Sequence, residues 1–214
     1  MNEAFIFDMD GVLLDSESLY DKCWLLACKE FDVDEKEALA LRMACLGKTE
    51  GECIKALEKK FASKKDFNAE AFYKRTDDLA LDSDCPPKPF AKEVLELLSA
   101  KKIPFCLATS SNRDSAKKML KGAGLLSFFN KDNSLCADDY ENMPSKPKPD
   151  IYLAACKKIS FLPQRSYAVE DSPAGIESAV TAGLKAIMIP DRLEPNDFCL
   201  RKAWKILPTL KDLL

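Results

Sequence analysis

The sequence contains no histidine among its 214 residues. That absence excludes Ser-His-Asp and Cys-His catalysis, zinc sites with histidine ligands and a histidine proton shuttle. Any acid–base chemistry near neutral pH must therefore use carboxylates, lysine, tyrosine or cysteine. Glycine is also scarce, with 7 residues, and the 12 prolines are too few for a disordered chain of low complexity. The apolar share of 47% is enough to bury a sizeable core.

A strong excess of one charge and a long apolar run are missing as well. The 32 basic and 35 acidic residues nearly balance, which argues against a generic nucleic-acid-binding protein. No apolar run approaches the roughly 18 residues of a membrane span, and the acidic segment MNEAFIFDMD differs from a secretory signal peptide. Nine cysteines, without a C-x-x-C pair, lie mostly in apolar runs. We therefore expect reduced core cysteines in a cytoplasmic monomer that has neither nucleic-acid nor membrane partners.

The chain changes its periodicity twice. Residues 4–7 form a short apolar run that predicts a strand, whereas residues 16–82 show helical spacing of apolar side chains. Thr49 and Glu52 have the spacing of a capping box, which predicts that a helix begins there. The segment Cys85-Pro86-Pro87 then cannot continue a helix.

After this break, strands and helices alternate. The expected strands span residues 103–109, 134–137, 167–170 and 185–189, and the expected helices span residues 89–100, 114–121, 150–158 and 173–182. Repeated strand–helix units predict a doubly wound parallel sheet, a Rossmann-like α/β core. Residues 1–15 and 86–214 are expected to form this catalytic core, and residues 16–85 an inserted, all-helical cap domain.

Polar side chains follow the first four predicted strands in chain order. They are Asp8 and Asp10, then Thr109 and Ser110, then Lys146, and finally Glu170 and Asp171. In an open α/β sheet, ligands bind beyond the carboxyl ends of the strands. Four such sets at one edge of the sheet therefore indicate a binding site.

The residue types at these positions predict phosphate chemistry. Four carboxylates would repel one another unless a cation lay among them, and oxygen ligands favour a hard cation such as Mg²⁺. Lys146 and Thr109 supply the charge and the hydroxyl that a phosphate would need. In the D-x-D sequence one carboxylate can attack phosphorus while the other handles the leaving-group proton, because residues two apart in a strand share a face. An aspartate nucleophile needs no histidine, because it is already ionised at neutral pH.

These segments resemble the four motifs of the haloacid dehalogenase superfamily of phosphotransferases. The segments FDMDGV at residues 7–12, LATS at 107–110, KPKPD at 146–150 and EDS at 170–172 match those motifs in order. The early helical insertion is similar to the cap of the β-phosphoglucomutase-like branch. The resemblance covers nearly the whole chain.

The resemblance assigns roles that the residue types alone leave open. It implies that Asp8 is the nucleophile that forms an aspartyl-phosphate, and that Asp10 protonates the leaving oxygen and then activates water. It implies that Thr109, Ser110 and Lys146 bind the phosphoryl group. It also implies a Mg²⁺ site formed by Asp8, Asp10 through its backbone carbonyl, Glu170 and Asp171.

Two lysines outside these motifs need separate interpretation. Gly47-Lys48-Thr49 resembles the end of a P-loop, but Arg42 stands where that motif requires glycine and no strand precedes it. Lys48 is then either a substrate contact in a cap loop or a solvated charge. Lys148 lies next to the motif lysine, but the pattern K-P-x-P-D selects Lys146 and leaves Lys148 as a surface charge.

The sequence therefore predicts a Mg²⁺-dependent phosphatase for a small phosphorylated metabolite, with sugar phosphates as the leading class. The cap is expected to exclude water and to read the organic part of the substrate. The alternatives are a β-phosphoglucomutase-type mutase, a dehalogenase that would need neither Asp10 nor Mg²⁺, and a phospho-aspartate signalling protein. By resemblance, the mutases carry a cap histidine at the position of Tyr20. A phenol with a pKa of ~10 replaces it poorly, so hydrolysis is the expected outcome.

Overall fold

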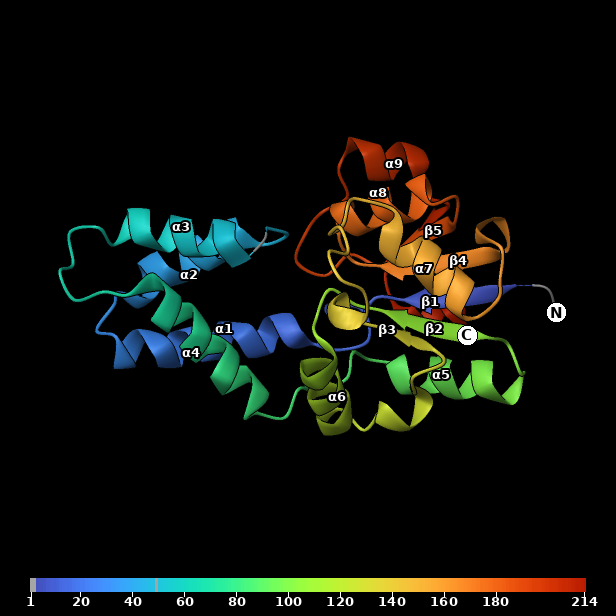
Figure 1. Ribbon diagram of the computed structural model, residues 1–214, viewed down its shortest axis with the longest axis horizontal. Helices are drawn as coiled ribbons and strands as arrows, with labels where there is room; N and C mark the ends of the chain where they lie inside the picture. Colours follow the sequence, from blue (N-terminus) through green and yellow to red (C-terminus); the bar gives the residue numbers. More distant parts are fainter. Residues whose placement is uncertain (1–2, 49) are drawn as a thin grey trace. The chain divides into compact units, whose positions relative to one another are not determined.

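The computed structural model describes residues 3–48 and 50–214. The chain divides into two compact units (Figure 1). An α/β unit runs to Asp15 and resumes at Cys85, and a helical unit spans Ser16–Asp84. The capping role predicted for Thr49 falls outside the described residues. Among the described residues, no helix has the length and apolar character needed to cross a membrane.

The α/β unit is built on a six-stranded parallel sheet. Its strands are β1 (Ala4–Phe7), β2 (Phe105–Ala108), β3 (Ser134–Leu135), β4 (Ser166–Glu170), β5 (Lys185–Met188) and β6 (Lys205–Ile206). Their order across the sheet is β3-β2-β1-β4-β5-β6, and every pair is parallel. The chain steps from β1 outward to β3 and then returns to β4 beside β1. This reversal produces the switch point at which open α/β sheets bind ligands.

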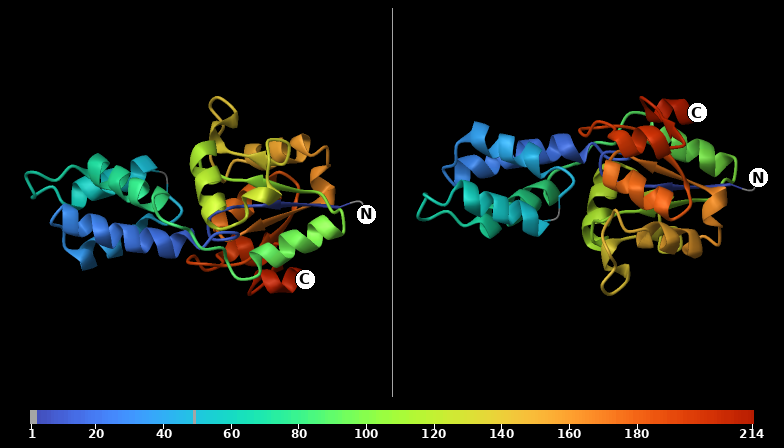
Figure 2. Two further views of the ribbon diagram at one scale, coloured as in Figure 1. Left: turned by 90° about the horizontal axis from the view of Figure 1, so that it is seen from below. Right: turned by 90° about the horizontal axis from the view of Figure 1, so that it is seen from above.

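Helices cover both faces of this sheet. They are α5 (Ala91–Ala100), α6 (Arg113–Gly122), α7 (Asp150–Lys158), α8 (Pro173–Thr181) and α9 (Asp197–Lys202). Helices α7 and α8 cover one face and α5 and α6 the other, as Figure 1 and the two views of Figure 2 show. Strand residues alternate between the faces, and Ile6, Cys106 and Ala168 pack in one buried cluster with side chains of α7 and α8. The prediction of a doubly wound, Rossmann-like sheet is thereby confirmed.

Among the residues that the structure describes, the helical unit contains four helices. They are α1 (Ser16–Glu30), α2 (Glu35–Cys45), α3 (Glu50–Lys60) and α4 (Ala69–Leu81). The side chains of Asp34 and Asn68 cap α2 and α4, because each accepts a hydrogen bond from a backbone N–H in the first turn. Trp24 of α1 meets Phe72 of α4 edge to face, with 5.3 Å between ring centroids, inside a buried aromatic and aliphatic core. This core makes the helical unit compact by itself.

The structure extends the predicted pattern at its C-terminal end. Helix α9 and strand β6 lie beyond residue 189, where no element was predicted. They have six and two residues, too few to show a hydrophobic period. Strand β3 has two residues rather than the predicted four, because the 3₁₀ turn Ala137–Asp139 follows almost at once. All nine cysteines are buried and free, as expected for reduced core residues.

Candidate active site

Three strands end at one buried cluster of polar groups. The backbone N–H of Asp8, just after β1, donates to the carbonyl of Val169 at 3.0 Å, and that of Thr109, just after β2, donates to Leu135 at 3.0 Å. Both side chains are buried, as is that of Glu170 at the end of β4. The continuing ladder of the parallel sheet therefore brings these residues to its carboxyl edge.

Lys146 joins two of the carboxylates. Its Nζ lies 2.5 Å from Oδ1 of Asp8 and 2.5 Å from Oε1 of Glu170, and all three side chains are at least 90% buried. The same amine lies 3.5 Å from the carbonyl of Ala108. A buried charge of this kind is tolerated because it is paired and hydrogen bonded. Lys146 is thus the motif lysine that the sequence pattern selected over its neighbour Lys148.

Tyr152 is a member of this cluster that the sequence reasoning missed. It lies on α7, is fully buried, and its hydroxyl donates to Oε1 of Glu170 at 2.5 Å. Its ring centroid is 5.4 Å from Nζ of Lys146. Ser172 donates to the other oxygen of Glu170 at 3.3 Å. Both oxygens of Glu170 are therefore engaged within the protein. The only signal for Tyr152 in the sequence was a hydroxyl on an otherwise apolar helix face.

The remaining predicted carboxylate of the fourth motif completes a candidate metal site. One oxygen each of Asp8, Glu170 and Asp171 lies within 4.8 Å of the others. Three hard oxygen donors at this spacing fit a cation such as Mg²⁺. Gly11, with φ of +74°, is required beside them, because a Cβ there would overlap the carboxylate of Asp171.

The electrostatics of the cluster reflect its crowding. Burial raises the pKa of Asp8 to about 7, with further upward contributions from Glu170 and Asp10 and an opposing one from Lys146. Burial disfavours the charge on Lys146, but Asp8 and Glu170 outweigh it and raise the pKa of that amine above its usual range. The negative charge is therefore only partly compensated, and an added cation would relieve the rest.

The side chain of Asp10 has a hydrogen-bond partner in the loop after β2. Its Oδ2 accepts a hydrogen bond from the hydroxyl of Ser111 at 3.2 Å, and its side chain is not part of the candidate metal cluster. The structure thus groups three of the four carboxylates that were expected to crowd together, and the fourth, Asp10, is close enough to contribute to the raised pKa of Asp8. Ser111, which the sequence analysis did not select, also donates its N–H to Oγ1 of Thr109 at 3.0 Å. Ser110 is exposed in the same loop.

The helical unit carries a separate polar pocket of about 210 Å³. Tyr20, Arg42 and Lys48 are among the residues that line it. Arg42 is buried and forms ion pairs with Glu17 at 2.5 Å and Asp21 at 3.0 Å, and its guanidinium lies 5.7 Å from the ring centroid of Tyr20. The charge of the buried cation in this pocket is therefore already compensated.

The α/β unit carries acidic residues and a lysine at the carboxyl edge of its parallel sheet, and a helical unit interrupts it after the first strand. This combination is typical of hydrolases that act on phosphate esters through an aspartate. Residues 5–189 match the sequence model of the family described as haloacid dehalogenase-like hydrolase. The chain belongs to this family.

Relatives that match nearly the whole of this chain agree with this assignment. The chain is 32% identical to the phosphorylated carbohydrates phosphatase of Thermotoga maritima, over 99% of this chain and 100% of the relative. It is 30% identical to (DL)-glycerol-3-phosphatase 1, mitochondrial, of Arabidopsis thaliana, over 97% of this chain and 70% of the relative. A solved structure of a HAD hydrolase, family IA, variant 3 from Entamoeba histolytica superposes with a TM-score of 0.77 at 26% identity, covering 98% of this chain and 94% of that one. The family match and the named relatives confirm the prediction of a haloacid dehalogenase-type phosphatase.

Proposed function

We propose that this phosphatase is Mg²⁺-dependent and hydrolyses a small sugar phosphate through an aspartyl-phosphate intermediate. The observation that carries the proposal is the bridge from Lys146 to Asp8 and Glu170, beside Asp171. One fixed cation and three close carboxylates at a sheet edge are what a phosphoryl group and a divalent metal require. The names of the relatives support a phosphorylated carbohydrate or polyol as substrate.

In the first step, an oxygen of Asp8 forms a bond to phosphorus as the bond from phosphorus to the ester oxygen breaks. Asp10 gives its proton to the departing oxygen, so that a neutral alcohol leaves. Ser111 holds the Asp10 carboxyl group by a hydrogen bond at 3.2 Å, which orients it for this transfer. The product on the enzyme is a mixed anhydride of phosphate and the Asp8 carboxyl group.

In the second step, Asp10 takes a proton from water as the water oxygen attacks phosphorus. The acyl phosphate bond breaks, inorganic phosphate leaves, and the Asp8 carboxylate and the protonated Asp10 are restored. The same residue serves as acid and then as base, so the cycle needs no histidine.

The remaining residues hold the phosphoryl group and its charge. Lys146 neutralises part of that charge, and Thr109 and Ser110 supply hydroxyl donors after β2. Asp8, the backbone carbonyl of Asp10, Glu170 and Asp171 would hold Mg²⁺, which when bound compensates the charge of the carboxylates and the phosphate. Glu170 already accepts from Lys146 and Tyr152, so it also fixes the position of the lysine.

The pocket of the helical unit, considered by itself, has a polar lining that suits hydroxyl groups. Its buried cation, Arg42, is neutralised by Glu17 and Asp21, so a second phosphate finds no uncompensated buried charge there. Hydroxyl groups of a sugar can exchange hydrogen bonds with such a polar lining. A cytoplasmic monomer without membrane or nucleic-acid partners remains part of this proposal.

The mutase alternative differs only in the fate of the phospho-enzyme. At the position where the resemblance places a histidine, Tyr20 is hydrogen bonded to Asp77 and lies beside Arg42. These contacts use the phenol to support the helical unit. We therefore infer that water reaches the aspartyl-phosphate and that hydrolysis is the main reaction.

The test measures products from a panel of sugar monophosphates, including β-glucose 1-phosphate, with Mg²⁺ and with EDTA. We expect inorganic phosphate release that disappears with EDTA and returns when Mg²⁺ is added in excess. Full turnover in EDTA would remove the metal from the proposal. Efficient conversion of β-glucose 1-phosphate to glucose 6-phosphate, stimulated by glucose 1,6-bisphosphate, would replace the phosphatase by a mutase.

A further inference from the structure

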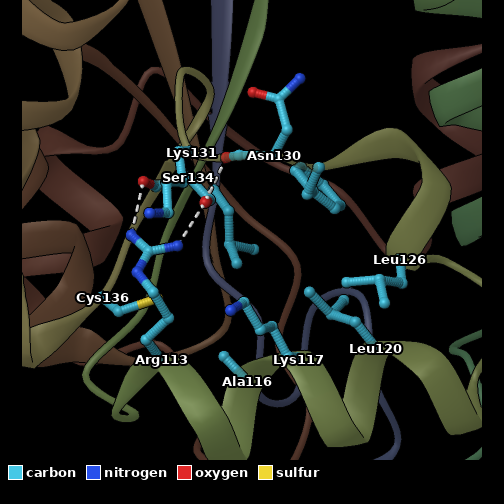
Figure 3. A pocket seen from close by; sticks show the side chains of 11 residues that line it. Arg113, Ala116, Lys117, Leu120, Leu126, Asn130, Lys131, Ser134 and Cys136 are labelled. Carbon is cyan, nitrogen blue, oxygen red and sulfur yellow. Dashed lines mark hydrogen bonds between the residues drawn. The ribbon is translucent and has the colours of Figure 1, made fainter.

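A recess of about 250 Å³ lies beneath α6, away from the carboxylate cluster (Figure 3). Helix α6 presents one face to it, with residues at helical spacing: Arg113, Ala116, Lys117 and Leu120. Leu107 of β2 forms part of the opposite wall, and Leu126 and Phe129 line the end that follows α6. None of the residues proposed for phosphoryl transfer belongs to this lining.

The walls of the recess are apolar and already ordered. Leu107, Leu120 and Phe129 are at least 90% buried. Phe129 is also held by Phe105, which it meets edge to face with 5.7 Å between ring centroids. Ala116, a small residue, faces the space from α6, and Ser134 of the two-residue edge strand β3 also lines it. A ligand can therefore enter without first reorganising a core.

The charged side chains that line the recess are basic. Arg113, Lys117 and Lys131 line it, and no acidic residue does. Arg113 is compensated, because its Nε donates to Oδ1 of Asp139 at 2.8 Å and its Nη1 donates to Ser134 at 3.0 Å. Within residues 3–48 and 50–214, neither of the two lysines forms an ion pair. Figure 3 shows Lys117 extending from α6 toward the recess.

We propose that this recess binds a small amphipathic anion. An aromatic ring or short acyl chain would occupy the apolar wall at Leu107 and Leu120, and a carboxylate or similar anionic head group would lie between Lys117 and Lys131. A cavity of about 150 Å³ accommodates benzene in another protein, so the volume here suits a ring with a short acidic chain. The proposal does not depend on the proposed phosphatase reaction.

The experiment titrates the full-length, ¹⁵N-labelled protein with three probes and follows backbone amide signals. The probes are 3-phenylpropionate, the neutral 3-phenylpropanamide, and propionate, which lacks the ring. We expect 3-phenylpropionate to shift signals between residues 107 and 136, and the amide and propionate to bind at least fivefold more weakly. The affinity should also fall with ionic strength, because exposed charges are screened by salt.

Two variants with the same change in charge test the position of the anion. Lys117→Gln/Lys131→Gln should lower the affinity for 3-phenylpropionate about fivefold, the scale of two exposed charge contacts. The matched variant Lys101→Gln/Lys121→Gln should retain the affinity, because neither lysine lines the recess. Ala116→Leu should abolish binding by filling the space. The melting curve of Ala116→Leu shows whether this variant is folded. If it is not folded, the two lysine double variants alone test whether the recess binds the anion.

Four results would overturn the proposal. One is equal affinity for the acid and the amide, another is an equal loss in both lysine variants, and the third is a set of shifts centred on the strand ends near Asp8 rather than on α6. Absence of any shift up to the solubility limit of 3-phenylpropionate would have the same force.

Discussion

The hydroxyl of Tyr152 and the amine of Lys146 share one acceptor, Oε1 of Glu170, each at 2.5 Å. Tyr152, in the first turn of α7, thereby supports Lys146, which lies in the loop before this helix and contacts Asp8. The three groups are buried together, so the position of each depends on the other two. Several consequences of this arrangement can be measured.

Tyr152→Phe removes one donor from a buried carboxylate and leaves the ring in place. We expect the free energy of unfolding to fall by about 1–3 kcal/mol, because Glu170 loses a hydrogen bond that water cannot replace. The kcat for phosphate release should fall while KM changes little, because the lysine that holds the phosphoryl group is less well positioned. Urea unfolding and steady-state kinetics measure both. Tyr140→Phe, at an exposed site, is the control, and equal behaviour of the two variants would contradict the role given to Tyr152.

Asp8→Asn should abolish turnover without unfolding the protein. A loss of kcat greater than about a hundredfold, or ~2.7 kcal/mol, is expected because the nucleophile is gone. Asp10→Asn should also cripple turnover, because it removes the proton carrier. Asp8→Asn activity above a hundredth of the wild-type value would contradict covalent catalysis by Asp8.

The raised pKa of Asp8 also predicts a pH dependence of stability in the metal-free protein. The folded-state pKa of about 7 exceeds the ordinary value of 3.8, so folding favours the protonated form. The stability that this proton contributes is complete below pH 3.8 and is lost as the pH rises through 7. Wild-type protein in EDTA should therefore lose stability across this range more than Asp8→Asn does. Unfolding curves at several pH values that run parallel for the two proteins would argue against the shift.

Gly175→Ala should disturb the cluster from the other side. A Cβ at this position of α8 would overlap the carboxylate of Glu170, which must then move and take Lys146 with it. We expect a lower melting temperature and a kcat reduced about tenfold or more, since both depend on this buried pair. Gly51→Ala is the control, because its added Cβ meets nothing within 4 Å beyond its chain neighbours and the backbone of its own helix, and it should stabilise α3 by about 0.5–1 kcal/mol. A fully active Gly175→Ala enzyme would show that Glu170 can relocate freely.

Asp77 should make the stability of the helical unit fall as the pH rises toward neutral. Burial raises the pKa of Asp77 to about 6, although the hydrogen bond from Tyr20 lowers this pKa in part. The stability that the protonated form contributes is complete below pH 3.8 and is lost as the pH rises through 6. Asp77→Asn should therefore stabilise the protein at pH 7 relative to wild type and change little near pH 3.5. Asp66→Asn, at an exposed site, should show no such difference in denaturant titrations at the two pH values.

The sequence predicted much of the fold because the information was local. Strand–helix alternation after Pro87 and helical spacing before it indicated the class of each segment, and the order of elements then implied a parallel sheet. The missed elements, α9 and β6, have too few residues to carry a period. The place of β6 beside β5 depends on the edge of the sheet already formed.

The sequence by itself also selected the chemistry, because Asp8, Lys146 and Glu170 each stand at a strand end or in the loop beside a helix start. The resemblance to the family pattern K-P-x-P-D chose Lys146 over Lys148, and the structure places Lys146 against both carboxylates. The roles of these residues in catalysis remain predictions for the experiments above.

Only the tertiary structure decided which side chains support those residues. Tyr152 reaches Glu170 across 18 positions of sequence and Ser111 reaches Asp10 across 101, so no local pattern could pair them. The same holds for the recess beneath α6, whose lining combines residues of β2, of α6 and of the segment that follows α6. Local sequence determines which element a residue joins, whereas contacts between elements arise only when the whole chain packs.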